Sequence, residues 1–330
     1  MRITVLSGGI GGARFLTGLR SAVDPDRDPI TVIGNTADDI WLFGLRVCPD
    51  LDTVMYTLGG GIDPERGWGR RDETWQAKDE LAAYGVEPTW FGLGDRDMAT
   101  HLVRTQMLTA GYPLSAVTEA LCARWDLGLR LLPMTDDRVE THVVVDDPTA
   151  EAGRRAVHFQ EYWVRLHAPV AHSVVPVGAE DARPGPGVVE AIAEADVLIL
   201  PPSNPVVSIG TILAVPGVAD AIRQTSAAVV GVSPIIGGAP VRGMADKLLP
   251  VIGVDVSARA VAAHYGSRSA GGLLDGWLVD ETDAADIAEI ERVGLAARAV
   301  PLYMTGPDAA QSLARDTLEL AASIQAVGAS

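Results

Sequence analysis

The chain has 330 residues, of which 48% are hydrophobic, and its 26 basic and 43 acidic side chains give a net charge of −17. That length suits one large domain or two ordinary ones, and the acidic balance argues against nucleic acids and anionic membranes as partners. The two cysteines, Cys48 and Cys122, make no disulfide framework, and no apolar stretch approaches the roughly 20 residues that span a bilayer. We expect a cytoplasmic protein without a signal peptide, since the first predicted strand begins almost at Met1.

That first strand, residues 3–6, leads into a glycine-rich turn and then into a helix expected near residues 13–22. Glycine permits positive φ and close approach of a ligand, and a helix N-terminus offers unpaired N–H groups to an anion. The sequence therefore predicts a phosphate-binding turn, with a tight turn that holds no ligand as the alternative. The residues assigned to it are Gly8, Gly9, Gly11, Gly12 and Arg14.

The turn departs from the fingerprint of dinucleotide-binding proteins at two points. Arg14 stands where the third glycine belongs, and the second predicted strand, residues 30–33, ends in Gly34-Asn35 rather than in an acid. No Lys-Ser or Lys-Thr follows the glycines, so this is not a Walker loop. An NAD-dependent oxidoreductase is thus a weaker alternative, and the identity of the nucleotide stays open at this point.

Strand and helix patterns alternate along the rest of the chain. A long helical region is followed by a β-rich stretch, and the Pro-Gly-Pro-Gly run at 184–187 marks the return to alternation. The expected helices are 72–84, 97–110, 113–125, 188–195 and 308–326. The expected strands are 139–145, 156–158, 173–177, 197–200, 227–232, 274–279 and 298–301.

This order predicts an α/β fold, a doubly wound and mostly parallel Rossmann-like sheet with a helical and small β insertion. We expect one α/β domain over residues 1–330, with core strands from 1–49 and 186–330. Residues 50–185 are expected to form an inserted helical and β-rich subdomain that covers the active-site cleft.

Ligands bind at the carboxyl ends of the strands in such sheets, and four predicted turns there are rich in small and polar residues. They are the glycine turn and residues 34–39, 201–205 and 233–240. Ser203 and Asn204 can offer donors and acceptors to a base, ribose or phosphate, although Ser203 could instead only cap a helix. Four such turns on one sheet edge predict a shared nucleotide cleft.

Aspartates gather close to these turns, at Asp38, Asp39, Asp50 and Asp52. Mg²⁺ binds through one or two carboxylates plus phosphate oxygens, so a carboxylate pair beside a diphosphate would suit it. A general base that takes a proton from an attacking hydroxyl is the other role open to these acids. Since acids are common in this chain, a purely structural or surface role is the alternative for any single one.

A second polar group, Arg96, His101 and Arg104, falls near the start of one predicted helix, directly after Asp95, and these three basic side chains could clamp a phosphate or carboxylate. A solvated helix face is the alternative. Aromatic residues are also concentrated in the first third of the chain, where they could stack on a planar ring or pack the helices onto the sheet. They are Trp41, Phe43, Tyr56, Trp68, Trp75, Trp90 and Phe91.

Taken together, these motifs resemble the CofD/FbiA family, the transferases that build the deazaflavin coenzyme F-420. The matching segments are residues 8–15, Cys48-Pro-Asp-Leu-Asp-Thr53, Leu93-Gly-Asp-Arg-Asp97, His158-Phe159-Gln160, Pro202-Ser-Asn-Pro205 and Ser233-Pro-Ile-Ile-Gly237. The wording of residues 11–15 and 67–74 is similar to that of the actinobacterial branch.

The resemblance implies a reaction and its partners. A guanosine diphosphate ester of enolpyruvate or lactate would donate its enolpyruvyl-phosphate or phospholactyl group to the ribityl hydroxyl of the deazaflavin Fo. GMP would leave, and either the dehydro form of coenzyme F-420-0 or coenzyme F-420-0 itself would result. The family also implies Mg²⁺ and a homodimer, and the actinobacterial wording favours the enolpyruvyl donor. A UDP-sugar-binding regulatory protein of similar fold and a structural protein with a vestigial cleft are the rival hypotheses.

Mapped onto this chemistry, each candidate residue takes an expected role. The nucleotide and diphosphate would be held by Gly8, Gly9, Gly11, Gly12, Arg14, Ser203, Asn204, Ser233, Pro234, Ile236 and Gly237. The metal would be held by Asp38, Asp39 and Asp50. The deazaflavin would be bound by Asn35, Thr36, Trp41, Asp52, Asp95, Arg96 and His101. Asp52 and Asp39 are expected to be the most important acids in catalysis.

Overall fold

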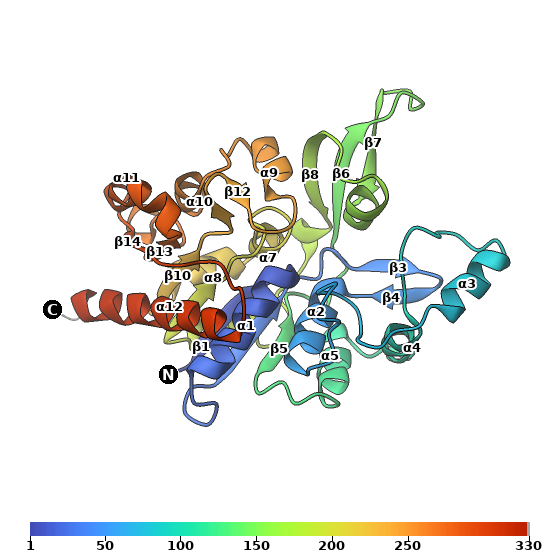
Figure 1. Ribbon diagram of the computed structural model, residues 1–330, viewed down its shortest axis with the longest axis horizontal. Helices are drawn as coiled ribbons and strands as arrows, with labels where there is room; N and C mark the ends of the chain where they lie inside the picture. The colour runs from blue at the N-terminus through green and yellow to red at the C-terminus, as the bar shows by residue number, and fades with distance from the viewer. Residues whose placement is uncertain (329–330) are drawn as a thin grey trace.

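A computed structural model describes residues 1–328, and a seven-stranded sheet runs through its centre (Figure 1). Every pair of neighbouring strands in this sheet is parallel, in the order β14-β13-β10-β9-β1-β2-β5. The strands are β1 (Ile3–Ser7), β2 (Ile30–Gly34), β5 (Arg130–Pro133), β9 (Val197–Leu200), β10 (Ala228–Val232), β13 (Gly276–Val279) and β14 (Ala296–Ala299). The expected doubly wound α/β fold is confirmed.

Helices cover both faces of the sheet, which explains why its central strands are almost entirely apolar. Within β1, Ile3 and Val5 belong to one apolar core and Leu6 to the other. The first core is completed by α1 (Gly9–Ala22), α2 (Pro49–Leu58), α5 (Leu114–Cys122) and α12 (Pro307–Gly328), of which α1 and α12 lie side by side in Figure 1. The second is completed by α6 (Val188–Ala193), α7 (Ile209–Ala214), α8 (Val218–Gln224), α10 (Ala258–Tyr265) and α11 (Ile287–Arg292).

The order of the strands reverses at β1. The chain passes from β1 to β2 and β5 on one side, and then crosses to β9, β10, β13 and β14 on the other. In open α/β sheets a crevice forms at such a reversal, outside the carboxyl ends of the strands. Here that point lies between the turn after β1 and the turn after β9.

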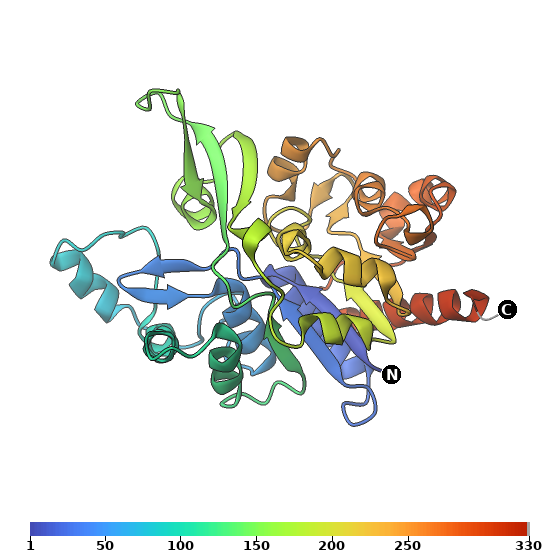
Figure 2. The same ribbon diagram turned by 180° about the vertical axis from the view of Figure 1, so that it is seen from behind.

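The expected division of the chain needs one correction, because core strand β5 comes from within residues 50–185. The segments around β5 form two arms, which extend to the same side of the molecule in Figure 2. The first arm contains β3 (Ile40–Leu42), β4 (Leu45–Val47), α3 (Gln76–Ala83) and α4 (Asp95–Thr109). The second is the antiparallel sheet β7-β6-β8, made of β6 (Glu140–Asp146), β7 (Arg154–His158) and β8 (Ala171–Val177).

The predicted helices and strands are found close to their expected positions, and the largest difference is at residues 72–84. There the helix α3 begins only at Gln76, because the Asp95 carboxylate accepts from the N–H groups of Gln76 and Ala77 and so fixes the first turn. Short elements complete the described chain: β11 (Ile235–Ile236), β12 (Ala239–Pro240), α9 (Ala245–Leu248), a π-helix (Glu161–Arg165) and 3-10 turns (Ala179–Asp181, Pro250–Ile252, Arg268–Ala270, Glu281–Asp286). No helix in residues 1–328 has the length and apolar character needed to cross a bilayer.

Candidate functional site

The turns after β1 and β9 meet at the reversal point of the sheet. The Ser203 hydroxyl donates to the Gly8 carbonyl at 2.9 Å. A Cβ on Gly11 would lie 2.2 Å from the Pro202 carbonyl oxygen, and one on Gly12 would lie 2.8 Å from Ser203 Oγ. These glycines are therefore required for the close approach of α1 to the neighbouring turn, and the Ser203 hydroxyl serves the same contact.

Gly9 differs from the other glycines of this turn. Its φ is +68°, and a Cβ built on it would meet no atom within 4 Å. It is also the first residue of α1, where the helix dipole attracts an anion, and its own N–H is directed at Asp50. Arg14, one turn further along α1, is exposed and makes no ion pair in the part of the chain that the structure describes. Open space for a phosphate thus exists at Gly9 rather than along the whole glycine run.

A buried carboxyl group, that of Asp50, lies beside this helix terminus, and a second, that of Asp38, is close enough to Asp50 for their charges to interact. Burial raises the pKa of Asp50 to about 6, while Asn35 Nδ2, which donates to Asp50 Oδ2 at 2.9 Å, and the Gly9 N–H oppose the shift. Burial and then the charge of Asp50 raise the pKa of Asp38 well above its ordinary value. Asp38 Oδ1 has no hydrogen-bond partner, and among residues 1–328 no basic side chain pairs with either carboxylate. The pair lacks a positive counter-charge.

The acidic residues fit Mg²⁺ only as a shared ion. Within the described chain, no three Asp, Glu, His or Cys side chains are grouped so that they could hold a metal by themselves. Mg²⁺, however, is usually bound by one or two carboxylates together with substrate phosphates and water. Asp38 and Asp50 supply that donor set next to the open space at Gly9. Asp39, the third predicted ligand, pairs instead with Arg46 at 3.2 Å, which leaves its Oδ1 without a partner.

A second network of buried polar side chains connects α2 with α4. Asp52 forms an ion pair with Arg104, whose Nη1 lies 2.9 Å from His101 Nδ1. His101 Nε2 is in turn 3.4 Å from Asp97 Oδ1, which accepts from the Tyr56 hydroxyl at 2.7 Å. His101 is only 1% exposed and Asp52 4%. We predicted both as deazaflavin ligands, which stays a prediction, and in the structure they belong to an internal network between α2 and α4.

Asn35 and Thr36 are also more buried than expected of deazaflavin ligands. Asn35 is 0% exposed, and its side-chain oxygen accepts from the Ala37 N–H and the Thr211 hydroxyl, while its nitrogen donates to Asp50. Thr36 is 1% exposed. In this structure the Asn35 side chain thus holds the acidic turn together, and the role of Asn35 and Thr36 as deazaflavin ligands stays a prediction.

The other predicted deazaflavin residues lie on the first arm. Asp95 accepts from the Thr74 hydroxyl as well as from the start of α3, and these hydrogen bonds lower its pKa. Arg96 donates to the Arg71 carbonyl at 3.2 Å. Both residues therefore fix the loop that precedes α3. Trp41 on β3 is 45% exposed, so its ring is available for stacking.

The remaining predicted nucleotide residues shape the turns after β9 and β10, on the same edge of the sheet. They are Asn204, Ser233, Pro234, Ile236 and Gly237. Asn204 Oδ1 accepts from two backbone N–H groups of its own turn, and the Ser233 hydroxyl bonds both the carbonyl and the N–H of Ile235. The Gly237 N–H donates to Asp283 at 3.0 Å. The hydrogen bonds of these residues thus stabilise the turns themselves.

Several residues of the site are outside the set that was assigned a binding or catalytic role. Arg46 is the partner of Asp39, and Tyr56 and Asp97 extend the Asp52 network. His158 and Gln160, which belong to a motif quoted for the resemblance, contact the backbone of the acidic turn. In the sequence, only the motif pointed to His158 and Gln160, because their partners Asp38 and Asp39 lie more than 100 positions earlier in the chain.

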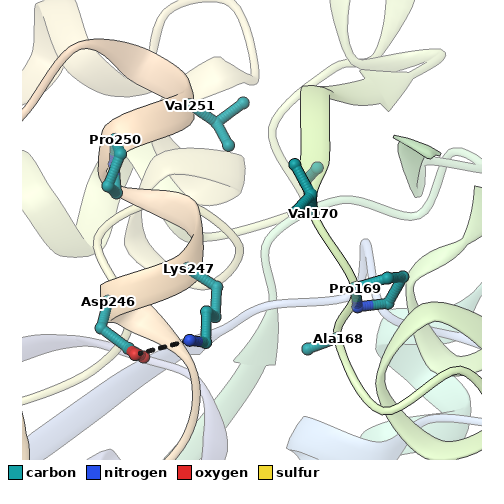
Figure 3. Close-up of a pocket in the computed structure, with 8 residues that line it drawn as sticks. Ala168, Pro169, Val170, Asp246, Lys247, Pro250 and Val251 are labelled. Carbon is teal, nitrogen blue, oxygen red and sulfur yellow. Dashed lines mark ion pairs between the residues drawn. The ribbon is translucent and has the colours of Figure 1, made fainter. Parts of the chain in front are cut away.

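A pocket of about 340 Å³ lies away from this edge (Figure 3). It separates Val170, at the start of β8, from Pro250 and Val251 on the opposite wall, and Asp246 and Lys247 pair across 3.5 Å at one end. None of the predicted site residues lines it. The pocket is therefore distinct from the sheet edge where the predicted site residues lie.

A family model described as 2-phospho-L-lactate transferase CofD matches residues 3–302. The chain belongs to the CofD family. The resemblance drawn from the sequence motifs is thereby confirmed, and the chain is a transferase of this family. The match includes both arms and the whole edge of the sheet where the acidic residues lie.

CofD-family relatives in actinobacteria are similar over nearly the full length. A protein named phosphoenolpyruvate transferase from Streptomyces griseus subsp. griseus is 68% identical and covers 99% of this chain and 100% of its own. Another of that name from Streptomyces coelicolor is 68% identical, covering 98% of this chain and 99% of its own. A third, from Thermobifida fusca, is 63% identical, covering 97% and 98%.

Among solved structures, a member of the UPF0052 family from Bacillus halodurans is similar, with a TM-score of 0.64 and 17% identity, covering 96% of this chain and 98% of that one. This likeness shows that the CofD-family fold is shared. It carries no information on ligands.

Proposed function

We propose that this CofD-family transferase is a phosphoenolpyruvate transferase of coenzyme F-420 biosynthesis. It would move enolpyruvyl phosphate from a guanosine diphosphate ester to the ribityl hydroxyl of the deazaflavin Fo, giving dehydro coenzyme F-420-0 and GMP. The relatives of that name at 63–68% identity support the enolpyruvyl donor over the lactyl donor.

The transfer is a substitution at one phosphorus atom. The ribityl oxygen bonds to the phosphorus that carries the enolpyruvyl group, and the bond from that phosphorus to the bridging oxygen breaks. The electron pair leaves with GMP, and the hydroxyl proton passes to a carboxylate. Such transfers depend on positioning and charge neutralisation and need no covalent nucleophile.

The observation that carries the proposal is the uncompensated pair Asp38 and Asp50 beside the open space at Gly9. We propose that these two carboxylates hold Mg²⁺, which when bound neutralises phosphate charge during phosphoryl transfer. The α1 N-terminus and Arg14 would meet the diphosphate from the other side. A cation would relieve the repulsion between these two buried carboxylates while both stay charged, so the site is suited to an ion that comes with the nucleotide.

Asp39 is the better of the two predicted catalytic acids to accept the hydroxyl proton. Burial, opposed by Arg46, sets its pKa at about 6, within the range useful to a general base near neutral pH. Its Oδ1 is free, whereas Asp52 is committed to Arg104. Trp41, two residues further on, would stack on the deazaflavin ring and bring the ribityl chain towards Asp39.

The test combines purified protein, Fo, Mg²⁺ and either guanosine donor, and weighs the products by mass spectrometry. Dehydro coenzyme F-420-0 from the enolpyruvyl donor is the expected product, and Asp39→Asn should remove most turnover while GDP binding survives. Absence of product from both donors would overturn the proposal. Calorimetry with GDP and with UDP-N-acetylglucosamine separates it from the UDP-sugar-binding alternative, and light scattering tests the homodimer that we also propose.

A further inference from the structure

The His158-Phe159-Gln160 motif at the end of β7 lies against the acidic turn. Phe159 is 7% exposed, packs against Tyr162 with ring centroids 6.4 Å apart, and belongs to the same apolar core as Ala37. The motif is therefore anchored through its central residue. His158 and Gln160 on either side of that anchor both reach the backbone of the turn.

The hydrogen bonds of His158 define its tautomer. The Gln160 N–H donates to His158 Nδ1 at 3.1 Å, so Nδ1 carries no proton. Nε2 must then carry it, and Nε2 donates to the Asp39 carbonyl at 3.2 Å. Burial also lowers the pKa of His158, which favours the same neutral ring. The imidazole thus connects the end of β7 to Asp39 in one fixed orientation.

Two neighbouring carbonyls are held in the same way. Gln160 Nε2 donates to the Asp38 carbonyl at 3.4 Å, and the Thr141 N–H of β6 donates to the Ala37 carbonyl at 2.6 Å. Three consecutive carbonyls, those of residues 37–39, therefore receive donors from the small antiparallel sheet.

We propose that His158 and Gln160 are positioning residues for the divalent-ion site, which rests on the proposed function. The buried carboxylates of Asp38 and Asp50 repel each other, and the turn that carries Asp38 would relax away from Asp50 if its backbone were released. The donors from β7 hold that backbone in place. The second arm, by this inference, is a brace for the metal-binding turn.

The experiment measures the affinity of the full chain for Mn²⁺, used as a probe ion, by electron paramagnetic resonance with and without GDP. His158→Phe keeps a flat ring of similar size but removes both hydrogen bonds, and His158→Gln retains a donor and an acceptor. Loss of a residue that orients metal ligands typically weakens affinity 10–100-fold, so we expect about tenfold weaker Mn²⁺ binding for His158→Phe. His158→Gln should recover most of it.

The matched control is His142→Phe, on the neighbouring strand. The ring centroids of His142 and His158 are 5.9 Å apart, and the His142 ring hydrogen-bonds to the Glu140 carboxylate rather than to the acidic turn. It should bind Mn²⁺ as the unaltered protein does. If His158→Phe does not fold, as judged by circular dichroism, Gln160→Met takes its place, with a severalfold weaker affinity expected.

Four results would overturn the inference: no Mn²⁺ binding by the unaltered protein, unaltered affinity in a folded His158→Phe, equal loss in His142→Phe, or no recovery in His158→Gln. Failure of the proposed function has a different signature. In that case Mn²⁺ binding follows the expected order among the variants, while no enolpyruvyl transfer to Fo is detected in any of them.

Discussion

Asp50→Asn should make the protein more stable at neutral pH and inactive. The pKa of Asp50 is raised from 3.8 to about 6, and one pKa unit corresponds to about 1.4 kcal/mol, so the charged form costs at most about 3 kcal/mol at pH 7.5. Asparagine has nearly the same shape, keeps an acceptor for Asn35 Nδ2 and carries no charge. The same substitution removes one of the two carboxylates proposed to hold Mg²⁺.

The sign of the pH dependence follows from the raised pKa. The stability associated with a protonated Asp50 is fully present below the unfolded-state pKa of 3.8 and is lost as the pH rises through about 6. The advantage of Asp50→Asn over the unaltered protein should therefore be small below about pH 4, about half of its full size near pH 5 and largest above pH 7. In thermal unfolding it should amount to several degrees, since 1 kcal/mol shifts the Tm by roughly 2–4 °C in proteins of 150–250 residues.

The assay is thermal unfolding of both proteins at pH 5 and 7.5, with and without Mg²⁺ and GDP. Mg²⁺ with GDP should raise the Tm of the unaltered protein and leave that of Asp50→Asn nearly unchanged. The reasoning is refuted if Asp50→Asn is destabilised equally at both pH values. Asp50 would then act as an ordinary structural acceptor, and its burial would carry no electrostatic cost.

Further substitutions distinguish structural from ligand-facing roles. Asp52→Asn leaves Arg104 buried without its counter-charge and should lower the free energy of unfolding by about 3–5 kcal/mol, measured by urea unfolding. The double variant Asp52→Leu, Arg104→Met should recover most of that stability. A double variant that loses the sum of the two single losses would contradict the ion-pair argument. Gly11→Ala should yield little folded protein on purification, because its Cβ would lie 2.2 Å from the Pro202 carbonyl oxygen. Gly9→Ala should cost only about 1–2 kcal/mol of backbone strain but weaken GDP binding in calorimetry, and unchanged GDP affinity would exclude a phosphate at this position.

Most of the fold could be predicted because its strands are buried on both faces. Val197–Leu200 is entirely buried, and such strands appear in a sequence as continuous apolar runs between helical patterns. The strand Arg130–Pro133 escaped prediction because it lacks such a continuous apolar run. It lies at the edge of the sheet, has only four residues, and begins with the exposed Arg130, so its pattern is weak.

The types of residue in the site could be predicted, but their burial could not. Asn35 directly follows a strand end, and His101 lies on the helix that follows a glycine-containing turn, both places where polar side chains often meet ligands. In the structure both side chains are buried in internal networks. The spacing of His101 and Arg104 on one helix is visible in the sequence. Their partner Asp52, on another helix, is not, because the contact depends on how α2 packs beside α4.

The acids of the site are of two kinds: some form an ion pair with an arginine, and the others have no basic partner in the described chain. Asp39 and Asp52 each have an arginine, so an added cation gains little from them. Asp38 and Asp50 have none in the described chain, so burying both in their charged forms costs free energy unless a proton or a cation neutralises the pair. A ligand that binds only the folded state stabilises it by RT ln(1 + [L]/Kd). Where both carboxylates are charged, the proposed ion would recover the free energy lost by burying them, which ties the stability of the site to the ion that the proposed transfer requires.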